Sequence, residues 1–100
     1  MKVNVQTPNF AADDKLIGFI ERRLNKLEQF YDKIVFADVF LKVQKTSEKQ
    51  NKVVEILVSI PGDELMVKKE ARTFEIGTDE CVQSLERQLK KRKQKQRAHF

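Results

Sequence analysis

The chain has 100 residues, the size of one domain, and its 40% of hydrophobic residues can bury a modest core. No apolar run approaches the roughly 20 residues of a membrane-spanning helix, so no membrane partner is expected. The single cysteine, Cys81, excludes an internal disulfide and a cysteine-based zinc site, and no secretory signal pattern follows Met1. Both observations favour a cytoplasmic protein.

The net charge of +5 is concentrated in one segment of the chain. Residues 1–86 hold 13 cations and 15 acids, whereas residues 87–97 hold seven cations and no acid. A basic block of this kind most often meets a polyanion, and nucleic acid is the commonest one. A solvated helix end is the alternative interpretation.

The first half of the chain predicts a strand and a helix. Apolar and polar residues alternate over Lys2–Thr7, which predicts a short strand that Pro8 ends. A helix follows through about residue 29, with Asp13 as its N-cap and one apolar stripe. The face opposite this stripe carries Lys15, Arg22 and Lys26.

Three further strands are predicted in the middle of the chain. Residues 34–45 and 53–60 alternate over a long stretch, with a polar loop between them. Pro61-Gly62 is a turn signature, because proline presets its φ angle and glycine accepts a positive φ at the next position. A weaker strand follows over Glu64–Arg72, and the two hairpins imply antiparallel pairing. Phe40, Leu57 and Met66 are expected to share the uncovered face of this sheet.

The chain closes with a second predicted helix, which Thr73 can cap. Its apolar stripe ends at Leu89, and a flexible basic tail is expected at about 94–100. Asp79, in the first turns of this helix, is expected to be a structural hydrogen-bonding residue and not an active group. The predicted fold is α+β, one domain over residues 1–100 with the order β-α-β-β-β-α. A four-stranded sheet carries both helices on one face, an architecture that resembles a double-stranded RNA-binding domain.

Three motifs of this chain resemble those of a known family. Lys26–Asp32 resembles a helix-ending K-L-E-x-[FY]-[FY]-D signature, and Leu41–Lys45 resembles an L-K-V-E-K strand. Asp79 with Leu85–Lys93 fits the pattern D-x5-L-x-R-Q-[LI]-x-K-x-K of a final helix. On these residues the chain resembles the short form of the ribosome hibernation-promoting factor family. This family is also called ribosome-associated inhibitor A or sigma-54 modulation proteins.

One segment departs from the family pattern. Many members begin the final helix with Met-Tyr-Ala-Ala, and this chain has Phe74-Glu75-Ile76-Gly77 there. Gly77 costs up to about 1 kcal/mol relative to alanine in a helix. The absent tyrosine puts in doubt any contact that it makes elsewhere in the family.

The resemblance implies a function in translation. Family members bind the small ribosomal subunit in the mRNA and tRNA channel, over the A and P sites, and block translation in stationary phase or stress. Short forms also favour ribosome dimers with the help of a second factor, so idle whole ribosomes and their dimers are further expected partners. No cofactor, metal, membrane or small-molecule substrate is implied, and the free protein is expected to be a monomer.

The residues expected to bind ribosomal RNA are cations of the two helices and of the L-K-V-Q-K strand. Arginine forms bidentate contacts with phosphate, lysine acts as a point charge, and each neutralised phosphate adds salt-dependent affinity. A solvated surface charge is the alternative for each of them. The expected set is Arg22, Lys26, Lys42, Lys45, Arg87, Lys90, Lys91 and Lys93.

Three other functions fit the sequence less well than this one. An enzyme is not expected, because His99 is the only histidine, Cys81 lies on an apolar stripe, and no catalytic motif occurs. A general double-stranded RNA-binding protein has the same order of core elements. A protein-interaction modulator of a sigma factor follows from the older family name, although the basic tail argues against it as the main role.

Overall fold

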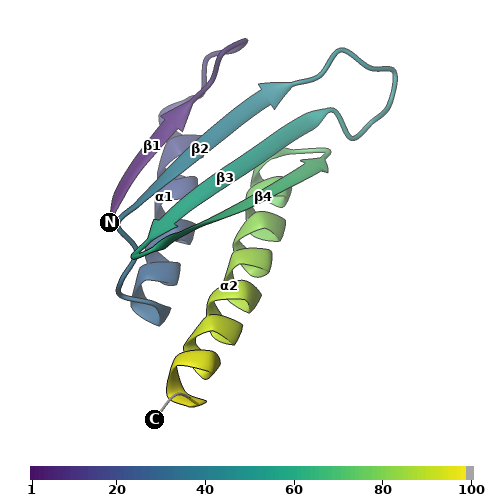
Figure 1. The fold of residues 1–100 in the computed structure, drawn as a ribbon. Coiled ribbons are helices and arrows are strands. Elements are labelled where there is room, and N and C mark those ends of the chain that lie inside the picture. Colours follow the sequence, from purple (N-terminus) through teal and green to yellow (C-terminus); the bar gives the residue numbers. More distant parts are fainter. Residues whose placement is uncertain (99–100) are drawn as a thin grey trace.

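The computed structural model describes the backbone of residues 1–98 and the side chains of residues 1–95. Its element order is the predicted β-α-β-β-β-α (Figure 1). The elements are β1 (Lys2–Gln6), α1 (Asp14–Phe30), β2 (Phe36–Val43), β3 (Lys52–Ile60), β4 (Asp63–Ala71) and α2 (Phe74–Ala98).

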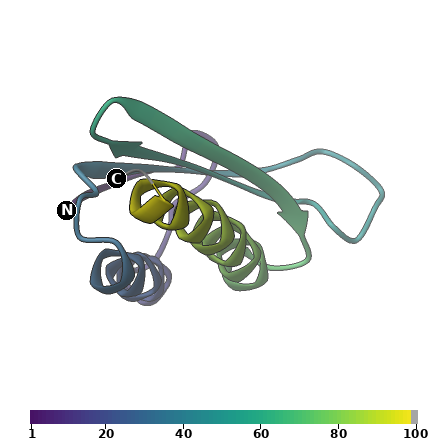
Figure 2. The same cartoon turned by 60° about the horizontal axis from the view of Figure 1, so that its bottom comes forward.

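The four strands form one mixed sheet in the order β1-β2-β3-β4. β2, β3 and β4 pair antiparallel as predicted, whereas β1 pairs parallel with β2, with Lys2 opposite Phe36. Parallel neighbours need a crossover connection, which α1 supplies here. Both helices pack on the same face of the sheet, which confirms the predicted layering (Figure 2).

The start of α1 is fixed by its predicted cap. The Leu16 N–H donates to the Asp13 carboxylate at 2.9 Å, and the Ile17 N–H donates to the Asp13 carbonyl at 3.1 Å. The first of these bonds satisfies one of the N–H groups that a helix start leaves free, and the second is the first backbone bond of the helix. The apolar stripe of α1 buries Ile20, Leu24 and Leu27 against the sheet.

The β3–β4 hairpin has the predicted two-residue turn. Ile60 pairs with Asp63 across Pro61-Gly62, and Gly62 has a φ of 79°. Residues with a Cβ rarely adopt this conformation, so glycine suits this position. The turn sets the register that places Val54, Ile56 and Val58 of β3 toward the helices, where all three are fully buried.

The structure at the start of α2 shows why glycine suits position 77. Thr73 caps the helix, since its hydroxyl accepts from the Ile76 N–H at 3.1 Å. A Cβ atom on Gly77 would lie 2.7 Å from the Val54 Cγ2 atom on β3. The glycine therefore allows the first turn of α2 to lie closer to the sheet than any other residue would.

The basic segment continues α2 as a helix. The backbone is helical to Ala98, well past Leu89, the last buried residue of the stripe. The sequence predicts a flexible tail at about 94–100. The side chains of residues 96–100 and the backbone of residues 99–100 lie outside the described part of the chain. No helix in the described part is long and apolar enough to cross a membrane.

The two sheet faces differ as the strand alternation predicts. The covered face and the helices form one apolar core, into which Cys81 and Leu85 of α2 are fully buried. The Cys81 thiol donates to the Val54 carbonyl at 3.5 Å, and burial raises the pKa of this thiol to about 12. On the uncovered face Phe40 and Met66 remain 41% and 58% exposed, and Leu57 lies directly opposite Met66.

Candidate nucleic-acid interface

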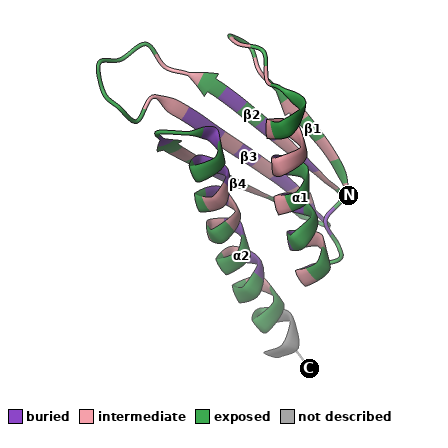
Figure 3. Ribbon diagram, turned by 180° about the vertical axis from the view of Figure 1, so that it is seen from behind, coloured by how far each residue is buried: buried purple, intermediate pink, exposed green. Residues whose placement is uncertain are grey.

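The two helices lie side by side over the sheet (Figure 3) and run in the same direction (Figure 1). Because each follows a strand of the same orientation, both begin at one end of the sheet and end at the other. Their outer surfaces therefore form one continuous layer, from which exposed cations can reach a common partner.

On α1 the predicted cationic face is present. Lys15, Arg22 and Lys26 are exposed, away from the buried stripe. Arg23 is different, since its Nε atom lies 2.9 Å from a carboxylate oxygen of Asp79 on α2. Its guanidinium carbon lies 5.0 Å from the centre of the Phe19 ring, within cation–π range. Arg23 thus links the two helices.

The Arg23–Asp79 pair gives Asp79 the structural role expected of it. The sequence did not indicate its partner, which belongs to α1. No periodicity within one helix could have identified this pair, because it depends on how the two helices are placed. The pair is part of a groove of about 330 Å³ lined by Arg23, Lys26, Leu27, Asp79, Val82, Gln83 and Glu86.

On α2 the basic residues divide into two groups. Arg87, Lys90 and Lys91 are exposed and take part in no ion pair within the described residues. Arg92 instead pairs with Asp63 of the β3–β4 turn, with 2.7 Å between its Nη1 atom and the carboxylate. The first group is therefore free to bind an anion, whereas Arg92 braces the helix.

Lys93, also predicted to bind RNA, contacts the end of α1. Its Nζ atom donates to the Phe30 carbonyl at 3.3 Å and lies 5.3 Å from the centre of the Phe30 ring. A lysine charge suits this place, since the last carbonyls of a helix are unpaired and carry partial negative charge. Lys93 remains exposed, so it both ties the helices together and adds charge to their common end.

Lys42 and Lys45 do not join the helix cations. Lys42 lies on β2 next to buried Leu41, so its side chain belongs to the uncovered face of the sheet. Lys45 lies in the loop after β2, at the opposite end of the molecule from the end of α2 (Figure 1). The eight predicted residues therefore form a helix-face group of six and a separate pair.

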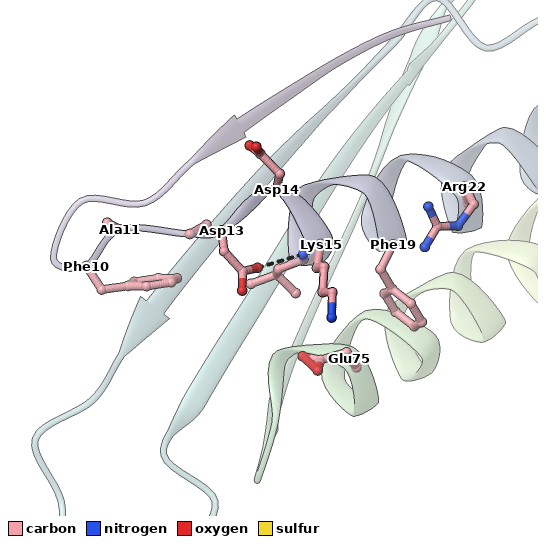
Figure 4. Close-up of a pocket in the computed structure, with 10 residues that line it drawn as sticks. Phe10, Ala11, Asp13, Asp14, Lys15, Phe19, Arg22 and Glu75 are labelled. Carbon is pink, nitrogen blue, oxygen red and sulfur yellow. Dashed lines mark hydrogen bonds between the residues drawn. The ribbon is translucent and has the colours of Figure 1, made fainter.

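A hollow that the sequence did not predict lies at the start of α1 (Figure 4). It has a volume of about 860 Å³ and is lined by Phe10, Phe19 and Glu75, among others. The rings of Phe10 and Phe74 stack beside it, with centres 4.7 Å apart. Asp13 lines it while capping α1, so this carboxylate serves the start of the helix.

These features define a class of protein. A mixed sheet with two parallel helices on one face, and exposed cations along both, is a small α+β domain suited to folded polyanions. No group of side chains able to hold a metal ion occurs in the described part of the chain. The model of the family described as sigma 54 modulation protein / S30EA ribosomal protein matches residues 3–97. The chain belongs to this family.

Individual relatives agree with this assignment. A ribosome hibernation promoting factor from Pseudomonas putida is 32% identical over 98 residues, which cover 98% of this chain and 92% of the relative. A protein of the same name from Escherichia coli (strain K12) is 28% identical over 99 residues, covering 99% and 100%. The ribosome hibernation promotion factor of Bacillus subtilis is 30% identical over 102 residues, which cover 100% of this chain and 52% of the relative.

Solved structures share the fold. A ribosomal subunit interface protein from Coxiella burnetii matches with a TM-score of 0.83 at 22% identity, over 93% of this chain and 98% of that one. The N-terminal domain of Protein Y from Thermus thermophilus matches with a TM-score of 0.78 at 25% identity, over 91% and 98%.

Proposed function

We propose that this protein is a ribosome hibernation factor that binds the small ribosomal subunit and blocks translation in stationary phase or stress. Family membership and the names of the relatives from Pseudomonas putida and Escherichia coli support this function. The observation that carries the proposal is the row of exposed cations on α2, beside those of α1, in a chain of this family. A ribosome-bound role places the protein in the cytoplasm.

The proposed mechanism is occupancy of the mRNA and tRNA channel, over the A and P sites. The helix-face cations Arg22, Lys26, Arg87, Lys90 and Lys91 contact phosphates of ribosomal RNA, with Lys93 at the end of the same layer. Each neutralised phosphate releases counterions, so affinity falls steeply with salt concentration. The bound protein excludes mRNA and tRNA sterically, and no covalent bond is made or broken.

The separate position of Lys42 and Lys45 fits an enclosed site. A channel surrounds its occupant, so cations on the sheet face and at the far loop meet different parts of its wall. A single RNA duplex, by contrast, would contact only the helix layer. Binding of whole idle ribosomes follows from the same site, since the channel persists when the subunits join.

The proposal is tested by co-sedimentation with purified ribosomes and separated subunits, with and without excess initiator tRNA and mRNA. We expect binding to the small subunit that tRNA and mRNA displace. Binding that they leave unchanged would contradict channel occupancy. Equal affinity for a generic RNA duplex at the same salt concentration would instead indicate a general double-stranded RNA-binding protein.

A further inference from the structure

The outer edge of β4 is an unpaired strand edge. β4 is the last strand of the sheet, and β3 is its only partner strand among the described residues. An edge strand directs the N–H and C=O groups of alternate residues away from the sheet, where another strand can pair with them. At nine residues β4 is long enough for such pairing. Met66, one residue before its middle, is 58% exposed.

The sequence of β4 is complementary to itself when reversed about Met66. If two copies pair antiparallel with the two Met66 residues opposite each other, Glu64 of each copy lies opposite Lys68 of the other. In the same register Leu65 lies opposite Val67, and Asp63 lies opposite Lys69. Every charged side chain of Asp63–Lys69 thus meets the opposite charge, and every apolar one meets another apolar one. Opposite charges and apolar pairs stabilise directly facing strand positions.

Neighbouring registers lack this match. In these registers the helices of both copies lie on the same side of the joined sheet. This condition requires the residue at the centre of the pairing to change by whole residues, to Val67 or to Leu65. When the pairing is centred on Val67, Glu64 faces Glu70 of the other copy, which is a repulsive pair. When the pairing is centred on Leu65, Glu64 faces Met66 of the other copy and no charge pair forms. The side chains therefore favour one register, as a specific interface requires.

We propose that two copies of this protein associate through β4, antiparallel and centred on Met66, into one continuous sheet with a two-fold axis. The interface uses the edge of β4, whereas the exposed cations proposed to bind RNA on the helices belong to α1 and α2. It uses none of the residues proposed to bind ribosomal RNA, and it departs from the monomer expected from the family resemblance. Because only one strand from each copy takes part, the association is reversible and is populated at high protein concentration.

A charge swap tests the register. Glu64→Lys and Lys68→Glu each turn both Glu64–Lys68 pairs of the dimer into like-charge pairs, and we expect each to lower the association constant about tenfold. The double variant recreates two attractive pairs and is expected to restore association. Sedimentation equilibrium from micromolar to millimolar concentration measures this, with Lys2→Glu on the opposite edge as the matched control. Failure of the double variant to recover would overturn the proposal.

A cysteine at the axis gives a second test that does not depend on charge. Directly opposite residues of paired strands lie about 4.5–5.5 Å apart at Cα, within disulfide range, so oxidised Met66→Cys should form a covalent dimer. Glu70→Cys is the matched control, because in this register it does not face its own copy. The buried Cys81 thiol should not react. Equal cross-linking at both positions would contradict the proposed centre.

The same variants separate this proposal from the ribosome site. Glu64 and Lys68 lie on the uncovered face of β4, away from the helix cations. We expect Glu64→Lys to pellet with small subunits as the unchanged protein does, even though it no longer self-associates. Loss of ribosome binding without loss of self-association would contradict the assignment of these residues to the dimer edge.

Discussion

At the scale of single residues, the exposed lysines of α2 are not equivalent. Lys90 and Lys91 are exposed and form no ion pair among the described residues. Lys93 is also exposed, but its ammonium group donates a hydrogen bond to the Phe30 carbonyl. The sequence motif groups the three together. Only the position of α1 shows that Lys93 has a second role.

The pair Lys90→Ala with Lys91→Ala is expected to weaken ribosome binding. Removal of two phosphate contacts should reduce the slope of log affinity against log salt by about 1.4 to 1.8, with little change in thermal stability. Lys93→Ala should lower both affinity and melting temperature, because it also frees the Phe30 carbonyl. Salt titrations of co-sedimentation and thermal melts by circular dichroism measure these effects. Unchanged affinity in the double variant would contradict the helix-face site.

Asp63 makes a pH-dependent contribution to stability. The Glu64 N–H and, secondarily, Arg92 lower the pKa of this carboxyl below its usual 3.8. Because the folded-state pKa lies below the unfolded value, the contribution is present above about pH 3.8 and is lost as the pH falls through the folded-state pKa. We expect Asp63→Ala to melt slightly earlier than the unchanged protein at pH 7. The difference should vanish in acid, and a difference that persists there would have another cause.

Cys81 is expected to be inert in the folded protein. Burial raises the pKa of its thiol to about 12, and the thiolate is the reactive species. A thiol reagent should therefore modify Cys81 only when urea unfolds the chain. The pKa of this thiol is higher in the folded state than in the unfolded state. Its ionisation in the unfolded chain therefore lowers the free energy of unfolding as the pH rises above about 9. Rapid labelling without denaturant would show that α2 leaves the sheet readily.

At the scale of elements, Gly77 controls how closely α2 approaches β3. Gly77→Ala improves helix propensity by up to about 1 kcal/mol, but its Cβ overlaps Val54. We expect a net loss of about 1–3 kcal/mol, as for other overpacked cores, measured by urea denaturation. Val54→Ala in the same chain should recover part of this loss.

Gly18 of α1 is the matched control. A Cβ there meets only the Nη1 atom of Arg22, at 3.2 Å, at the end of a flexible side chain. Gly18→Ala should therefore be neutral or stabilise by up to about 1 kcal/mol. If Gly77→Ala and Gly18→Ala changed stability equally, contact with β3 would not explain the need for glycine at position 77.

At the scale of the whole molecule, the cations occupy more than one side. We expect Lys42→Ala with Lys45→Ala to weaken binding to small subunits, because a channel contacts the sheet side and the far loop. The same variant should leave affinity for a simple RNA duplex almost unchanged, whereas Lys90→Ala with Lys91→Ala should weaken both. Parallel binding titrations at one salt concentration measure this. Equal effects of the two double variants on duplex RNA would contradict separate contact surfaces.

Most of this fold was predictable from local patterns. Asp13, Thr73 and Pro61-Gly62 act through hydrogen bonds and backbone angles within a few residues, so their roles are visible in the sequence. The apolar periods of α1 and β3 predict which faces are buried for the same reason. Each of these features is a short-range property of the chain.

The candidate site was predictable only in part. The sequence by itself determined the elements, the basic end of α2 and the outward cations of each helix, because these depend on spacing along one segment. Only the tertiary structure decided that Arg23 pairs with Asp79 and that Lys93 reaches Phe30. These relations depend on distances between elements far apart in the chain, and no local period encodes them.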